Sequence, residues 1–213
     1  MYQQRSNMPN IFMVGHSNYE LATFLEMLQR ENIGTLYDIR VMPFSRYVPQ
    51  FNQPSLKAAI EEMGIRYIYK KELGPRVEGD EPIFSKEGFG YDKVLQRPRL
   101  VQGLSDILKD HAEEDNVAIM ATKREPLECH RFLVLTPILE RLGSKVSHIL
   151  PDETLSNEAC EEKLIATMHR RIKRKTYTFN EIHDEKYNAY YAQSEKIAKV
   201  GIKKYSKLKS KMS

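Results

Sequence analysis

Three residues with reactive or charged side chains, Cys129, His130 and Arg131, stand together in the stretch EPLECHRFLVLTPILERLG (125–143). They precede an apolar run with the period of a helix, which predicts that they lie in its first turn. The positive end of a helix dipole and neighbouring cationic side chains both lower the pKa of a thiol. This position therefore makes Cys129 a candidate thiolate nucleophile.

The same three residues admit other interpretations. Arg131 and the free N–H groups of a helix start also suit a phosphate, with Cys129 and His130 contributing to the anion site. Alternatively, Cys129 is a small buried hydrophobe and His130 only begins the helix. A metal site would need His16 as a further ligand, and no C-x-x-C or H-x-x-x-H spacing supports one, so we predict no metal.

A histidine elsewhere in the chain is the expected partner of the thiol. Adjacent residues on a helix point in different directions, so His130 need not act as the base for Cys129. His16, in the stretch GHSN (15–18) after an apolar run, is the better candidate. Ser17 is expected at the anion site or as a helix cap; in the alternative interpretation it only caps the helix and His16 has no chemical role.

A second cluster lies in the stretch YDIRVMPFSRYVPQFN (37–52). Asp38 and Arg40 alternate with Ile39 at the end of a predicted strand, so the two charged side chains share one face. They form either a structural ion pair or an arginine held for an anionic ligand. Ser45 and Arg46 follow in a proline-containing loop, and we predict that these residues also contribute to substrate or anion binding.

The elements that position these residues follow from the apolar periodicity. Predicted strands cover 11–15, 34–40, 65–70, 116–122 and 144–150, and predicted helices cover 20–32, 55–64, 100–114, 129–143 and 156–171. This alternation is typical of an α/β fold with a mostly parallel sheet and helices on both faces. Ligands in such folds bind beyond the carboxyl ends of the strands, where the candidate residues stand.

Three breaks in the periodicity carry their own predictions. Gly64 is expected to end its helix in the left-handed conformation. Pro137 is expected to kink or break the helix that contains it. The segment 71–99 has no sustained period and is expected to be a functional loop, because long irregular inserts are uncommon in compact domains.

Composition excludes several classes of protein. The chain has no run of eighteen apolar residues, and its N-terminal stretch MYQQRSNMPN lacks the apolar centre of a secretory signal. Its two cysteines, Cys129 and Cys160, do not make a disulfide framework, so we predict a cytoplasmic protein with no membrane partner and a structural Cys160. The common nucleotide-binding and hydrolase motifs are missing, and the sequence indicates no particular cofactor.

The charge is unevenly distributed. Residues 1–167 hold 20 Lys/Arg and 25 Asp/Glu, whereas residues 168–213 hold 13 and 4. We therefore predict an α/β domain over 1–167 and a basic C-terminal tail over 168–213, an extended arm followed by a helix. Such a tail either binds nucleic acid or is a solvated helix that aids solubility. Its tyrosines either stack on bases or pack the tail on the body; they are Tyr177, Tyr187, Tyr190 and Tyr191.

Three stretches together resemble the domain-of-unknown-function 488 family: VGHSNYELATFLEML, LYDIRVMPFSRYVPQFNQPSLKAAIEEMGIRYIYKKELG and EPLECHRFLVLTPILERLGSKVSHILPD. The family pattern runs G-H-S, D-x-R, S-R-x-x-P-x-F, E-L-G and C-H-R, and the resemblance covers about residues 11–165. It implies no settled reaction. It implies that the motif residues converge: His16, Asp38, Arg40, Arg46, Glu72 and 129–131. Family members commonly have a Cys and a Glu where this chain has Ala121 and Lys123, which favours single-thiolate or anion-binding chemistry here.

The leading hypothesis is a hydrolase or transferase that acts on a phosphate-bearing substrate, either a nucleotide or nucleic acid. Arginines would bind the anion, His16 would transfer protons, Cys129 would be the nucleophile, and Glu72 would be a second acid/base or an orienting group. Two alternatives stay open: a nucleic-acid-binding module without catalysis, and a rhodanese-like sulfur carrier that uses Cys129. The sequence does not indicate an oligomeric state.

Overall fold

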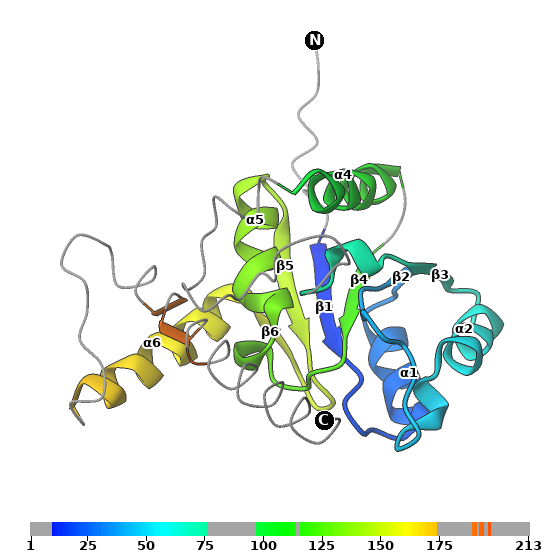
Figure 1. The fold of residues 1–213 in the computed structure, drawn as a ribbon, viewed down its shortest axis with the longest axis horizontal. Helices are drawn as coiled ribbons and strands as arrows, with labels where there is room; N and C mark the ends of the chain where they lie inside the picture. The colour runs from blue at the N-terminus through cyan, green and yellow to red at the C-terminus, as the bar shows by residue number, and fades with distance from the viewer. Residues whose placement is uncertain are drawn as a thin grey trace, which may run out of the picture.

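The computed structural model describes residues 10–75, 97–113 and 116–173, together with 189, 190, 192, 193 and 196. Six strands in these ranges form one sheet with the order β3-β2-β4-β1-β5-β6 (Figure 1). The strands are β1 (Asn10–Gly15), β2 (Thr35–Asp38), β3 (Arg66–Tyr69), β4 (Val117–Ala121), β5 (Lys145–Ile149) and β6 (Thr154–Ser156). Every pair is parallel except β5–β6, so the predicted α/β fold with a mostly parallel sheet is confirmed.

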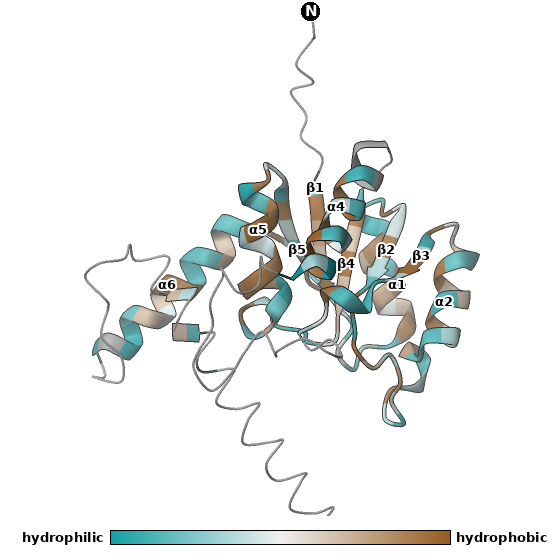
Figure 2. Ribbon diagram, turned by 45° about the horizontal axis from the view of Figure 1, so that its top comes forward, coloured by the Kyte–Doolittle hydropathy of each residue, from teal (hydrophilic) through white to brown (hydrophobic). Residues whose placement is uncertain are grey.

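Helices cover both faces of this sheet. They are α1 (Leu21–Arg30), α2 (Gln53–Glu62), α4 (Pro98–Glu113), α5 (Thr136–Arg141) and α6 (Asn157–Lys173). One buried cluster joins Phe12 and Val14 of β1 to α1 and α2, and another joins Ile11 and Met13 to α4, α5 and α6. Because successive side chains of a strand point to opposite faces, β1 contributes to both clusters, as an interior parallel strand does. Figure 2 shows the apolar strands between helices whose outer faces are hydrophilic.

Local breaks fall where the sequence predicts them. Gly64 ends α2 with a φ of +75°, and Pro137 stands in the first turn of α5. The predicted helix over 129–143 is divided there: a π-helix covers Arg131–Leu135 and α5 follows it. The predicted loop over 71–99 begins with a 3₁₀ turn at Lys71–Leu73, and most of its remainder lies outside the described residues.

The predicted tail is described only in part. Helix α6 runs through residue 168, where the boundary between body and tail was expected, and the arm after it lies outside the described residues. Five described tail residues beyond α6 are helical, namely 189, 190, 192, 193 and 196. Tyr190 is 3% exposed, which confirms for this tyrosine that it packs the tail on the body. The helices among the described residues are too short or too polar to span a lipid bilayer.

Candidate functional site

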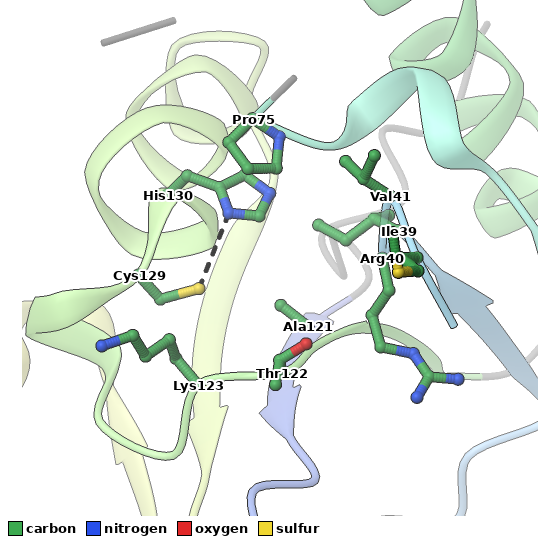
Figure 3. A pocket seen from close by; sticks show the side chains of 10 residues that line it. Ile39, Arg40, Val41, Pro75, Ala121, Thr122, Lys123, Cys129 and His130 are labelled. Atoms are coloured by element: carbon green, nitrogen blue, oxygen red, sulfur yellow. Dashed lines mark hydrogen bonds between the residues drawn. The ribbon is translucent and has the colours of Figure 1, made fainter. Parts of the chain in front are cut away.

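A pocket of about 300 Å³ lies at the carboxyl ends of β2 and β4 (Figure 3). Strands β2, β4 and β1 are neighbours in the sheet and run in the same direction, so their following loops meet at one edge. Residues 39–42 after β2 form one wall, and residues 121–123 at the end of β4 form another. Pro75, Cys129 and His130 complete the lining. This is where ligands bind in open parallel sheets.

Cys129 and His130 interact directly in this pocket. The Sγ of Cys129 lies 3.7 Å from the Nδ1 of His130 (Figure 3). Cys129 has extended backbone angles, φ −122° and ψ 143°, whereas His130 is helical. The expected divergence of adjacent helical side chains therefore does not apply, because Cys129 stands just outside the helix. The preference for His16 over His130 as the partner of the thiol is wrong for this reason.

The charges around Cys129 favour its thiolate. Burial raises the pKa of this thiol, but Arg131 and His130 outweigh it, and the pKa falls to about 6. A hydrogen bond to the backbone of Arg131 acts in the same direction. Cys160 shows the opposite behaviour, because burial raises its pKa to about 11. The two cysteines thus differ in chemistry although both are buried.

Arg131 is fully buried and holds the loop that follows β4. Its guanidinium donates to the carbonyl oxygens of Lys123, at 2.5 Å, and Arg124, at 2.9 Å. Its Nε has no partner among the described residues, and none of the ion pairs formed within them includes this arginine. Gly15 makes room for this loop, since a Cβ there would stand 1.8 Å from the Lys123 oxygen. Arg131 therefore acts on the thiol through its charge and does not extend its guanidinium into the pocket.

Asp38 and Arg40 form a buried ion pair behind the pocket. Arg40 donates from Nη2 to Asp38 at 2.6 Å and from Nε at 2.9 Å, and its Nη1 donates to the carbonyl of Phe51 at 2.7 Å. The hydroxyl of Tyr67 donates to the same carboxylate at 2.5 Å. Of the two readings left open by the sequence, the contacts favour a structural ion pair, with one edge of Arg40 lining the pocket.

His16 belongs to this buried network. Its Nε2 lies 3.2 Å from the Nη1 of Arg40, and its Nδ1 lies 2.8 Å from the carbonyl oxygen of Ser17. Because a guanidinium only donates, Nε2 accepts and Nδ1 carries the proton. Burial and the charge of Arg40 lower the pKa of His16 to about 4, and its ring stacks on Phe51 at 4.5 Å. Both ring nitrogens are hydrogen-bonded within the protein, so the role of His16 is to hold the side chain of Arg40 in place.

Four other predicted residues do not line the pocket. Ser17 adopts a φ of +46° and donates to Asn18. Ser45 accepts from the backbone of Tyr47, and exposed Arg46 stacks on the Tyr47 ring. Glu72 lies 3.7 Å from Lys70, which also pairs with Asp106 on α4. Of the residues that the family resemblance brings together, Arg40, Cys129 and His130 line the pocket. Asp38, His16 and Arg131 are buried next to these lining residues and do not reach the pocket.

Sequence reasoning missed Thr122, Lys123 and Tyr67. Thr122 is the last residue of a predicted strand and Lys123 follows it, so the rule that ligands bind beyond the carboxyl ends of the strands also predicts these two residues. Tyr67 lies 29 residues from Asp38 in the sequence, and no local pattern connects the two. Among the described residues, no group of three or more His, Cys, Asp or Glu side chains is arranged to hold a metal ion.

Comparison with known protein families finds one match. Residues 20–137 match the family described as Domain of unknown function DUF488. This range contains Asp38, Arg40 and the 129–131 group, whereas His16 precedes it. Searches of curated proteins and of solved structures find no match. Since the match covers more than half of the chain, the protein belongs to the DUF488 family.

Proposed function

We propose that this protein is an enzyme that uses the Cys129 thiolate as a nucleophile on a small phosphate-bearing substrate. One observation carries the proposal: Cys129 lines a pocket beside a histidine, His130, that has a ring nitrogen without a hydrogen-bond partner among the described residues. His130 is 8% exposed, and its Nε2 has no hydrogen-bond partner among the described residues. A buried unpaired ring nitrogen is costly in a folded protein, so a ligand that contacts it would be favoured.

The lining of the pocket supports an anionic substrate. Arg40 and Lys123 line it, and none of its described lining residues is acidic. The charge of Arg40 is balanced by Asp38, so Lys123 is the lining cation that can pair with an incoming anion. Lys123 pairs with Glu128 at 3.3 Å, and both side chains are more than half exposed, so an incoming anion competes with a weak surface ion pair.

Apolar side chains supply the rest of the pocket wall. They are Ile39, Val41, Met42 and Pro75. A pocket with apolar walls and a few charged groups is typical of sites for small organic ligands. A phosphate ester with an apolar or aromatic group, such as a nucleotide, combines both properties.

The proposed reaction is a displacement at phosphorus. The thiolate of Cys129 forms an S–P bond while the P–O bond to the leaving group breaks, and the leaving oxygen takes up a proton from His130. Water then attacks the phosphorus, the S–P bond breaks, and the proton lost by the water returns to His130. Atoms and charges balance, and no further cofactor is needed.

The experiment uses p-nitrophenyl phosphate as a probe, with p-nitrophenyl acetate as an acyl analogue. We expect release of p-nitrophenol from the phosphate and a phosphorylated Cys129 in mass spectra. Cys129→Ser should lose both signals, whereas Cys160→Ser should keep them. If Cys129→Ser releases as much p-nitrophenol as the wild type, Cys129 is not the nucleophile. If the wild type releases p-nitrophenol from the acetate but not from the phosphate, the substrate is not a phosphate ester.

Of the two alternative functions, nucleic-acid binding receives less support from the described residues. Tyr190, one of the tyrosines that would stack on bases in this alternative, is buried against the body, and Tyr177, Tyr187 and Tyr191 lie outside the described residues. A sulfur carrier would use the same thiolate. Thiosulfate cyanolysis that depends on Cys129, without turnover of the phosphate ester, would favour that function over the proposed one.

A further inference from the structure

The C-terminal part of the chain contacts the segment that carries the thiol. We use the name docking segment for residues 189, 190, 192 and 193. The side chain of Gln193 donates from Nε2 to the carbonyl oxygen of Leu127 at 2.8 Å, and Gln193 is 5% exposed. Leu127 lies two residues before Cys129, in the 3₁₀ turn Pro126–Glu128. A contact from 66 residues away in the sequence therefore fixes the backbone next to the thiol.

A second contact lies on the other side of the thiol. The ring of Tyr190 stacks on that of Phe132 with 5.0 Å between centroids and 22° between planes. Phe132 stands three residues after Cys129, in the π-helix Arg131–Leu135. The Tyr190 hydroxyl donates to Glu161 of α6 at 2.9 Å, which fixes the orientation of its ring. Ala189 and Ala192 of the docking segment are also buried.

The two contacted elements are intrinsically weak. A single 3₁₀ turn has poor hydrogen-bond geometry, and π-helical turns are rare and occur mostly at functional sites. Cys129 lies between them, and its distances to Arg131 and His130 depend on how these elements are held. None of the docking-segment residues is among those that line the pocket.

We propose that the docking segment positions the nucleophile: Gln193 and Tyr190 hold the two elements on either side of Cys129, so that its sulfur stays next to His130 and Arg131. The inference rests on the proposed function, because it concerns the same thiolate. Gln193 and Tyr190 are positioning residues, since they act through Leu127 and Phe132 without touching the pocket. The basic tail would then have a role in the chemistry of the body.

The test measures alkylation of Cys129 by iodoacetamide as a function of pH, on the full chain, with mass spectrometry to identify the modified residue. Gln193→Met keeps the length of the side chain and removes the donor, and Tyr190→Ala removes the stacking. Lys196→Ala is the matched control, because Lys196 is exposed and lies in the same part of the chain. Circular dichroism verifies that each variant is folded.

We expect Gln193→Met and Tyr190→Ala to react about fivefold more slowly at pH 6 and at nearly the wild-type rate at pH 9, as a rise in the thiol pKa from about 6 to about 7 gives. Lys196→Ala should match the wild type. The groups that face the thiol, Arg131 and His130, are unchanged in every variant.

The outcomes separate the two proposals. If the wild-type protein reacts much more slowly at pH 6 than at pH 9, Cys129 is not a thiolate at pH 6, and this result contradicts the proposed function. A reactive wild type with unchanged profiles in folded Gln193→Met and Tyr190→Ala contradicts the positioning role alone. If Tyr190→Ala does not fold, Tyr190→Leu replaces it, since leucine fills part of the space but cannot stack on Phe132.

Discussion

The chemistry of the site is decided by how single residues are paired. Arg131 is a buried cation that donates only to carbonyl oxygens, so its charge is not neutralised by a carboxylate among the described residues. The thiolate of Cys129 is the group that gains from this charge. In contrast, Arg40 is paired with a carboxylate. The two arginines therefore differ in role although both were expected to bind the substrate.

Gly15 provides a test at this scale, because the loop held by Arg131 passes directly over it. Gly15→Ala should lower the free energy of unfolding by about 3 kcal/mol or more, since the new methyl group meets a backbone oxygen that cannot rotate away. Urea denaturation measures the change. Gly64→Ala is the control: a Cβ there meets nothing within 4 Å, and its positive φ costs about 1 kcal/mol. A loss at Gly15 no greater than that at Gly64 contradicts the account of this loop.

At the scale of elements, the buried pair of Asp38 and Arg40 joins β2 and β3 to the loop after β2. Tyr67 of β3 donates to Asp38, and Arg40 reaches the carbonyl of Phe51 beyond the loop. Removing one partner of a buried charged pair costs far more than removing an exposed one. The pair thus fixes one wall of the pocket.

Tyr67→Phe should lower the free energy of unfolding by about 2 kcal/mol, because it removes a hydrogen bond to a buried carboxylate. The matched control is Tyr69→Phe on the same strand, whose hydroxyl makes a 3.3 Å contact with an exposed carbonyl, and which should change stability little. Equal midpoints of urea unfolding for the two variants would show that the Tyr67 hydroxyl does not stabilise the pair.

The elements were largely predictable, and the pairing of side chains was not. Apolar runs such as 116–122 give a clear strand signal because both faces of an interior parallel strand are buried. Strand β6 was missed because three residues, Thr154–Ser156, are too short to show a period. The partner of Cys129 was missed because it depends on where the helix begins to within one residue, and boundaries are the least determined feature of a sequence pattern.

At the scale of the whole molecule, two buried histidines tie stability to pH. Burial and, for His16, the charge of Arg40 lower the pKa values of His16 and His148 to about 4. The unfolded chain binds protons at these sites below about pH 6.5, where the folded chain does not. Stability therefore falls as the pH falls from about 6.5 to about 4.

His148→Gln should show a smaller loss of unfolding free energy between pH 7 and pH 5 than the wild type, because one of the two groups no longer titrates. Urea denaturation at the two pH values measures the loss. Exposed His169, changed in the same way, serves as the control and should keep the full loss. If both variants keep it, the histidine at 148 does not contribute to the acid sensitivity.

The most direct measurement is the rate at which iodoacetamide modifies each cysteine of the wild-type protein between pH 4 and pH 10, followed by mass spectrometry. We predict that Cys129 reacts with a midpoint near pH 6, while Cys160 remains unmodified over most of this range. A midpoint for Cys129 near 8.5, the ordinary value of a free thiol, would contradict the claim that this site stabilises a thiolate.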